Sequence, residues 1–268
     1  MISEDSGQNR QNDEWHRAPI ESTAEWGTIS NMERPASRTR YDVSGNLEGE
    51  YVDVAETVLV NKKGVTDLPA IQRLEEEGLA AAYESLFSEV RIDTPMTCEL
   101  LRHIHQRIFG DLYEWAGRWR TLNISKPGAV WPAAAFLDSS MQGLERDVLS
   151  KHPARMLAAD AEFCRAAGEI QGEFLAIHPF REGNARTIKL MTNLLAAQTG
   201  RPPLVYDQSD EGAQRYIAAA SAALLKKNYQ PLNVIIAAAV CAAQLKPSLG
   251  AAPESYDAFP PGTEGAPQ

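Results

Sequence analysis

Apolar residues recur at three- and four-residue steps through most of the middle of the chain, which is the spacing of one face of an α-helix. The clearest run lies between residues 154 and 177, where the apolar positions are Phe163, Cys164, Ala167, Ile170, Phe174 and Ile177. Proline disfavours helical backbone in the residue before it, so we expect this helix to end at His178-Pro179. The pattern predicts a long, largely buried helix.

Other segments with the same period predict further helices. Asp67 is a suitable N-cap for the first of them, and Pro95 suits the first turn of the second. The segments are 68–87, the run opened by Asp93-Thr94-Pro95, about 133–149, the run that restarts near Gly183, about 211–227 and about 231–245.

The residues around 120–131 have a different pattern. An extended piece is expected at 120–125, a break at Pro127-Gly128, and a second extended piece near Val130-Trp131. A glycine-containing break between two extended pieces is typical of a β-hairpin. The chain is therefore predicted to be mainly α, a helical bundle with one small hairpin in a single domain.

The two ends of the chain lack these patterns. Residues 1–50 are polar and are interpreted as a mobile arm, while residues 246–268 are rich in Pro, Gly and Ala and are interpreted as a disordered tail. The folded domain is expected over residues 51–245. The N-terminus lacks the apolar core of a signal peptide and no stretch reaches the length of a membrane span, so we expect a cytoplasmic protein without a membrane partner. Export to a host or a neighbouring cell stays open.

Composition narrows the choice of partner. The 268 residues carry a formal net charge of −10, with 44% hydrophobic and 23% charged residues. This balance is ordinary for a globular protein, but it disfavours direct nucleic-acid binding, as does the lack of a basic recognition helix. The three cysteines are far apart in apolar stretches and are expected to be buried thiols.

The loop from His178 to Arg186, His-Pro-Phe-Arg-Glu-Gly-Asn-Ala-Arg, combines groups that suit phosphate chemistry. A helix that begins at Gly183-Asn184 offers unpaired N–H groups and a positive dipole end to an anion, and Arg186 adds a cation. Glu182 would repel a phosphate unless Mg²⁺ lay between them. His178 has a pKa suited to accepting a proton. Together they predict phosphoryl or nucleotidyl transfer.

Simpler interpretations apply to single residues of the loop. Phe180 is most simply an anchor into the core that fixes the loop. His178 alone would fit a helix cap and Glu182 alone a solvated side chain. The co-occurrence of base, carboxylate and anion cradle within one loop favours the functional interpretation.

The sequence HPFREGNAR closely resembles the Fic motif, His-x-Phe-x-Asp/Glu-Gly-Asn-Gly-Arg followed by x-x-Arg. Residues 104–126 resemble the stretch that leads into the flap hairpin of that family, and residues 59–77 resemble its opening helix region. The resemblance covers roughly residues 51–245. It implies a Fic fold that binds ATP and Mg²⁺ and transfers AMP to a Tyr, Ser or Thr hydroxyl of a target protein.

The resemblance also implies roles for single residues. His178 would deprotonate the target hydroxyl, and Glu182 would hold Mg²⁺. Gly183 and Asn184 would form the anion hole, and Arg186 would grip the remaining phosphates. The flap would bind the target as an added β-strand, and its residues are Asn123, Ile124, Ser125, Lys126, Val130 and Trp131.

Two positions of the nucleotide site depart from the motif. Ala185 replaces the usual glycine, which a helical backbone tolerates, and Lys189 replaces the second arginine, keeping the charge but losing the bidentate fork. These changes leave alternatives open: transfer of phosphate, as in a kinase, or of phosphocholine, or a module that only binds nucleotide.

A candidate inhibitory motif precedes the domain. Ser44-Gly-Asn-Leu-Glu48-Gly49 matches Ser/Thr-x-x-x-Glu-Gly/Asn, which marks an inhibitory helix in many Fic proteins, but Gly45-Asn46 is poor helix material. We expect a separate small antitoxin-like inhibitor, or none. The resemblance then suggests a bacterial toxin or an effector.

Overall fold

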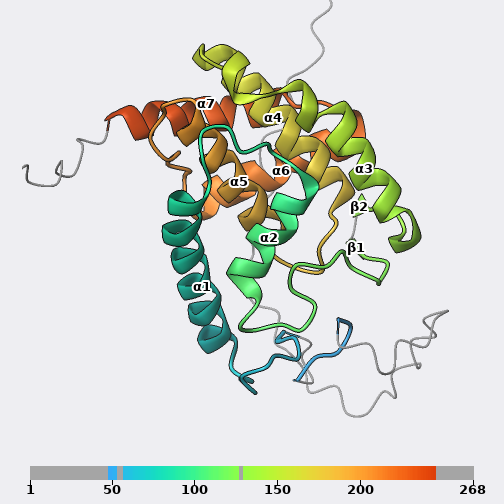
Figure 1. Ribbon diagram of the computed structural model, residues 1–268. Helices are drawn as coiled ribbons and strands as arrows, with labels where there is room; N and C mark the ends of the chain where they lie inside the picture. Colours follow the sequence, from blue (N-terminus) through green and yellow to red (C-terminus); the bar gives the residue numbers. More distant parts are fainter. Residues whose placement is uncertain (1–47, 53–56, 127–128, 246–268) are drawn as a thin grey trace, which may run out of the picture. The chain divides into compact units, whose positions relative to one another are not determined.

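A computed structural model describes residues 48–52, 57–126 and 129–245 (Figure 1). These residues belong to one compact unit, Val43–Gln268. The predicted tail and residues 1–47 of the predicted arm lie outside the described residues. The described part of the arm, residues 48–50, continues into a bridge between Tyr51 and Leu59.

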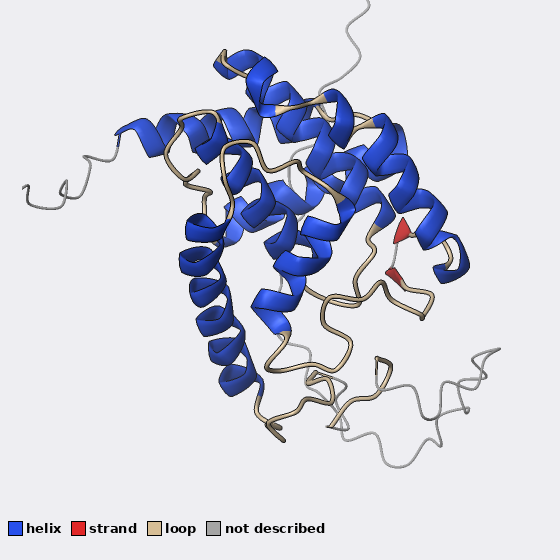
Figure 2. Cartoon of the chain, in the orientation of Figure 1, coloured by secondary structure: helices blue, strands red, loops and turns tan. Residues whose placement is uncertain are grey.

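The described chain is mostly helical, with one two-stranded hairpin, which confirms the predicted fold class (Figure 2). Its strands pair antiparallel, with Ser125 opposite Val130. The elements are α1 (Leu68–Glu89), α2 (Cys98–Phe109), β1 (Ser125–Lys126), β2 (Ala129–Val130), α3 (Leu137–Asp147), α4 (Asp160–Ile177), α5 (Asn184–Gln198), α6 (Asp210–Lys226) and α7 (Gln230–Leu245), with 3₁₀ turns at Ala134–Phe136, Leu149–Lys151 and Ala154–Met156.

Helix α4 forms the centre of the bundle and contacts α3, α5, α6 and α7 (Figure 1). It begins at Asp160, so the predicted start near residue 154 was wrong. The Arg201 side chain explains the difference, because its Nη1 donates to the Leu157 carbonyl (2.9 Å) and its Nη2 to the Ala158 carbonyl (2.8 Å). Those carbonyls are thus occupied by a distant guanidinium where a continuous helix would use its own N–H groups.

Three other predicted elements also differ from the structure. Helix α2 begins at Cys98 with Thr97 as its N-cap, because the carbonyls of Arg91 and Thr94 accept hydrogen bonds from Gln198 and hold the preceding loop open. The predicted extended piece from residue 120 is strand only at Ser125–Lys126. The predicted helix over 133–149 is divided into a 3₁₀ turn and α3.

Helix α1 packs on α2, and α2 packs on α5, which brings α1 close to the start of α5. The Asp67 carboxylate caps α1 by accepting from the Ala70 N–H at 2.9 Å, as the sequence predicted. Cys164 is buried, Cys98 is partly buried and Cys241 is exposed, so the expectation of three buried thiols was wrong. Within the described ranges, no helix has both the length and the apolarity needed to cross a membrane.

Candidate active site

The site is built on the loop between α4 and α5. Helix α4 ends at Ile177. Its C-cap, His178, has a left-handed backbone conformation (φ 54°, ψ 59°), while its N–H still donates to the Phe174 carbonyl at 2.9 Å. Such a conformation is uncommon for a residue other than glycine. Strained backbone of this kind is often found at functional positions, where the surrounding structure maintains it.

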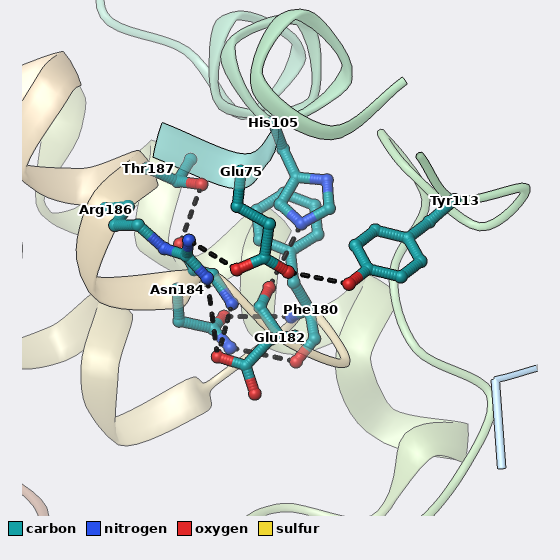
Figure 3. Close-up of polar contacts among 9 residues, drawn as sticks. Glu75, His105, Tyr113, Phe180, Glu182, Asn184, Arg186 and Thr187 are labelled. Atoms are coloured by element: carbon teal, nitrogen blue, oxygen red, sulfur yellow. Dashed lines mark hydrogen bonds and ion pairs between the residues drawn. The ribbon is translucent and has the colours of Figure 1, made fainter. Parts of the chain in front are cut away.

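Phe180 and Asn184 give the loop its shape (Figure 3). The Phe180 ring is fully buried and stacks on the His105 ring, with centroids 3.8 Å apart. The Asn184 amide closes the loop, because its Oδ1 accepts from the Phe180 N–H and its Nδ2 donates to the Phe180 carbonyl, both at 2.9 Å. The Asn184 side chain thus shapes the loop, and its backbone N–H belongs to the first turn of α5.

His105 supports the loop from α2. The Gly117 N–H donates to His105 Nδ1 at 2.9 Å, so Nε2 carries the proton and donates to the Glu182 carbonyl at 3.1 Å. Burial lowers the pKa of His105 to about 3, which keeps the ring neutral. Sequence reasoning missed His105, although a histidine between the apolar positions Ile104 and Ile108 was a signal that it faces the core.

Gly183 opens α5 with a φ of 76°, and a Cβ atom there would lie 2.3 Å from the Phe109 ring. Only glycine satisfies both conditions without a shift of its surroundings. Among the described residues no side chain caps α5. The N–H groups of its first turn are therefore suited to an anion, which is how Gly183 and Asn184 were predicted to act.

Glu182 extends towards solvent beside these N–H groups. Its side chain is 52% exposed, Oε1 accepts from the Gly183 N–H at 3.0 Å, and the same oxygen lies 3.8 Å from Arg186 Nη2. No group of three or more His, Cys, Asp or Glu residues in the described ranges is placed to hold a metal ion. A lone exposed carboxylate fits Mg²⁺, which is commonly held by one carboxylate together with waters and substrate phosphates.

Arg186 is held by Glu75 of α1, which in turn binds Tyr113 from the segment after α2 (Figure 3). Its Nη1 lies 2.7 Å from Glu75 Oε2, and the Tyr113 hydroxyl donates to Glu75 Oε1 at 2.6 Å. The guanidinium also lies over the Phe109 ring, 4.7 Å from its centroid. Sequence reasoning missed Glu75 and Tyr113, because only tertiary packing brings α1 and the segment after α2 next to the start of α5.

Ala185 and Lys189 complete the predicted nucleotide site. Ala185 lies in the first turn of α5, with helical backbone as expected. The Lys189 ammonium group lies over two tyrosine rings, 4.0 Å from the centroid of Tyr216 and 4.8 Å from that of Tyr206. Burial lowers the pKa of Lys189. Lys189 also lines a cavity of about 320 Å³ between α6 and α7. Phosphate binding by Lys189 therefore stays a prediction.

The hairpin lies close to His178. The Trp131 ring packs against the His178 ring with centroids 4.4 Å apart, and its Nε1 donates to the Leu175 carbonyl at 3.1 Å. Asn123 accepts from the Ala134 N–H, whereas Val130 is 78% exposed. The predicted flap residues therefore divide into side chains that brace the hairpin and others that face solvent. Ile124 is half-buried, Ser125 is exposed, and Lys126 lies in β1.

Glu48 lies at the base of the same hairpin. Its Oε2 accepts from the Thr121 N–H at 2.7 Å and from the Thr121 hydroxyl at 3.0 Å. Its backbone carbonyl accepts from Arg181 Nε at 2.7 Å. Glu48 and Gly49 form a turn, and Ser44 lies outside the described residues. The inhibitory role stays a prediction. Glu48 contacts the hairpin base through Thr121 and the α4–α5 loop through Arg181.

The chain is similar in sequence to a known protein family and to named relatives. Residues 95–196 match the model of the Fic/DOC family. The chain is similar to the protein adenylyltransferase VbhT of Bartonella schoenbuchensis, with 33% identity over 152 residues, 56% of this chain and 31% of VbhT. It is also similar to the probable protein adenylyltransferase y4lH of Sinorhizobium fredii, with 28% identity over 53% of this chain and 72% of y4lH. The chain thus spans about a third of the length of VbhT.

Solved structures show the same fold at lower identity. The N-terminal FIC domain of Bep8 from Bartonella sp. 1-1C has a TM-score of 0.60 at 18% identity, covering 72% of this chain and 95% of that domain. BepC from Bartonella tribocorum, solved with bound AMPPNP, has a TM-score of 0.57 at 18% identity, covering 72% of this chain and 97% of BepC. Both are described as VirB-translocated effector proteins.

Proposed function

Because residues 95–196 match the model of the Fic/DOC family, we propose that the chain is a Fic protein that transfers AMP from ATP to a Tyr, Ser or Thr hydroxyl of a target protein. One observation carries the proposal: His178 and the Glu182 carboxylate lie on the α4–α5 loop, Arg186 lies on the first turn of α5 directly after it, and buried contacts hold this segment in shape. Relatives named protein adenylyltransferase and the AMPPNP-bound relative BepC support it.

In this proposal His178 accepts the proton of the target hydroxyl as its oxygen attacks the α-phosphorus of ATP. A new oxygen–phosphorus bond forms, the bond to the bridging oxygen breaks, and pyrophosphate leaves. The N–H groups at the start of α5 stabilise the charge on the α-phosphate. Arg186 faces the phosphates from a fixed position, since Glu75 and the Phe109 ring hold its guanidinium.

The Glu182 carboxylate would hold Mg²⁺, which supplies neutralisation of phosphate charge when bound. The hairpin would bind an extended segment of the target along its backbone edge. The target protein is thus the proposed partner. The predictions of a toxin or effector role, of a separate antitoxin-like inhibitor and of a cytoplasmic location rest on the sequence and its family resemblance.

The proposal is tested by incubating a cell lysate with the protein, Mg²⁺ and ATP labelled on either the α- or the γ-phosphate. We expect a target protein to take up the α-label and to gain the mass of AMP. His178→Ala should label nothing while its unfolding temperature stays near that of the wild type, because the side chain lies at a helix end. Uptake of the γ-label would indicate a kinase, and nucleotide binding without a covalent label would indicate a binding module. Either result would overturn the proposal.

A further inference from the structure

A buried arginine holds the root of the hairpin. Arg120 is 2% exposed, and its guanidinium donates to three backbone carbonyls: Nε to His178 (2.9 Å), Nη1 to Leu122 (2.6 Å) and Nη2 to Pro132 (2.7 Å). Its own N–H donates to the Pro179 carbonyl at 2.8 Å. One side chain therefore contacts both the hairpin and the loop that carries the base.

The three carbonyls that Arg120 binds lie before the hairpin, after the hairpin and at His178. Leu122 precedes β1 and Pro132 follows β2, so the guanidinium grips both ends of the hairpin. The third carbonyl is that of His178 itself. Because the guanidinium is planar and its N–H directions are fixed, it sets the hairpin and His178 at a defined relative position.

The charge of Arg120 has a partner at the same place. Burial lowers the pKa of Arg120, and the charge of Glu48 opposes that effect. Glu48 is itself 6% exposed and holds the Thr121 N–H and hydroxyl, next to Arg120 in the chain. A buried ion is costly unless hydrogen bonds and opposite charge offset the loss of water, and here three carbonyls and the nearby Glu48 charge do so.

We propose that Arg120 is a positioning residue, which places the target strand bound to the hairpin within reach of His178. The inference rests on the proposed function. It follows from the geometry because the acceptor hydroxyl would be carried by the hairpin and the base by the loop, and Arg120 joins the two. A displacement of about 1 Å between reacting groups lowers a rate by about 100-fold.

Arg201 provides a matched control. It is also a buried arginine, 9% exposed, and donates to the carbonyls of Leu157 and Ala158 and to the Asp160 carboxylate. These contacts fix the segment before α4, whereas those of Arg120 hold the two ends of the hairpin. Arg120→Lys and Arg201→Lys thus make the same chemical change at two buried arginines. Of the two, Arg120 joins the hairpin to His178.

The first measurement needs no transfer activity. Nuclear Overhauser contacts should connect the Trp131 and His178 rings in the wild type, whose centroids lie 4.4 Å apart, and also the Phe180 and His105 rings, 3.8 Å apart. We expect Arg120→Lys to lose the first contact and keep the second, and Arg201→Lys to keep both. Absence of the Trp131–His178 contact in the wild type, or its persistence in Arg120→Lys, would overturn the proposal.

The second measurement compares ATP affinity with the single-turnover rate of AMP transfer. Arg120→Lys should bind ATP within about twofold of the wild type yet transfer about 100-fold more slowly, whereas Arg201→Lys should transfer within about twofold. Equal losses in both variants would mean a general effect on stability and would overturn the inference. If Arg120→Lys does not fold, Arg120→Gln, which has no charge to bury, replaces it under the same criteria. A wild type that transfers nothing refutes the proposed function, while the ring contacts still decide this inference.

Discussion

Arg186 has a carboxylate partner within the fold, which changes how its role in phosphate binding is understood. Its Nη1 lies 2.7 Å from Glu75, and that carboxylate also accepts from Tyr113. An unpaired arginine on the loop would move freely and lose side-chain entropy on binding a phosphate. The network holds the guanidinium in place before a phosphate binds. The Glu75 carboxylate also neutralises part of the positive charge that the phosphate would meet.

A double-mutant cycle tests this pair. Glu75→Gln and Arg186→Gln should each lower the free energy of unfolding, because each leaves a largely buried partner without its counter-charge. We expect a coupling energy of about 1–3 kcal/mol, the range for residues in one ion-pair network. Denaturant unfolding of the four proteins gives the value. The exposed Arg102–Glu99 pair is the control and should couple by less than about 1 kcal/mol. Additive effects at Glu75 and Arg186 would show that the pair does not fix the guanidinium.

His105 predicts a pH dependence of stability. Its pKa is about 3 in the folded protein because burial disfavours the charged ring, against about 6.5 in the unfolded chain. The unfolded state therefore binds the extra proton between these values, and stability is present above pH 6.5 and lost as the pH falls towards 3. The loss is about 1.4 kcal/mol per pH unit for one proton.

This contribution is measured as the free energy of unfolding from pH 7 to pH 5, before most carboxylates titrate. His105→Gln keeps one acceptor and one donor but cannot titrate, so its profile should be flatter than that of the wild type. His103, on the same helix, has a side chain that is 46% exposed, and His103→Gln is the matched control, which should change the profile less than His105→Gln does. Identical profiles for the wild type and His105→Gln would contradict the assignment of a neutral buried ring.

At the scale of elements, periodicity predicted the helices well and their ends less well. The errors lie where a side chain distant in sequence takes a backbone carbonyl, as Arg201 does before α4 and Gln198 before α2. The loop motif could be predicted because its residues are contiguous. Glu75 and Arg120 could not, because their roles depend on packing across the chain.

The start of α5 depends on glycine at position 183. Gly183→Ala introduces both left-handed backbone strain and a Cβ atom 2.3 Å from the Phe109 ring. Gly200 has a similar φ of 78° but has no atom within 4 Å of its Cβ position, so Gly200→Ala introduces the strain alone. We expect Gly200→Ala to cost about 1–2 kcal/mol and Gly183→Ala a further 1–3 kcal/mol from overpacking. Chemical denaturation measures both, and equal costs would show that the Phe109 ring moves aside.

At the scale of the whole molecule, separate parts of the described unit meet at the α4–α5 loop and the first turn of α5. Helix α1 reaches it through Glu75, the hairpin through Arg120, and the segment around residue 48 through Arg181, which donates to the Glu48 carbonyl and to the Tyr51 hydroxyl. The loop residues that the sequence predicted are thus held in place by residues from distant parts of the domain.

The charge of the whole chain bears on the role of Glu182. A protein with a formal net charge of −10 repels ATP, and Glu182 adds a negative charge beside the phosphate cradle. Without Mg²⁺, Glu182→Gln should therefore bind ATP more tightly than the wild type. With Mg²⁺ the order should reverse, because the wild type gains a metal ligand that the amide does not replace well.

Calorimetry of ATP binding with Mg²⁺ and with a chelator tests this reversal. The control is Glu162→Gln, which removes the same charge from the first turn of α4, roughly 20 Å along the helix from the loop. If the effect came from net charge alone, both variants would bind ATP more tightly in both conditions. We expect only Glu182→Gln to reduce the gain in affinity from Mg²⁺, by about tenfold, the scale of one charge-assisted contact. An unchanged response to Mg²⁺ in Glu182→Gln would show that this carboxylate does not hold the ion, and the proposed transfer would then require another metal ligand.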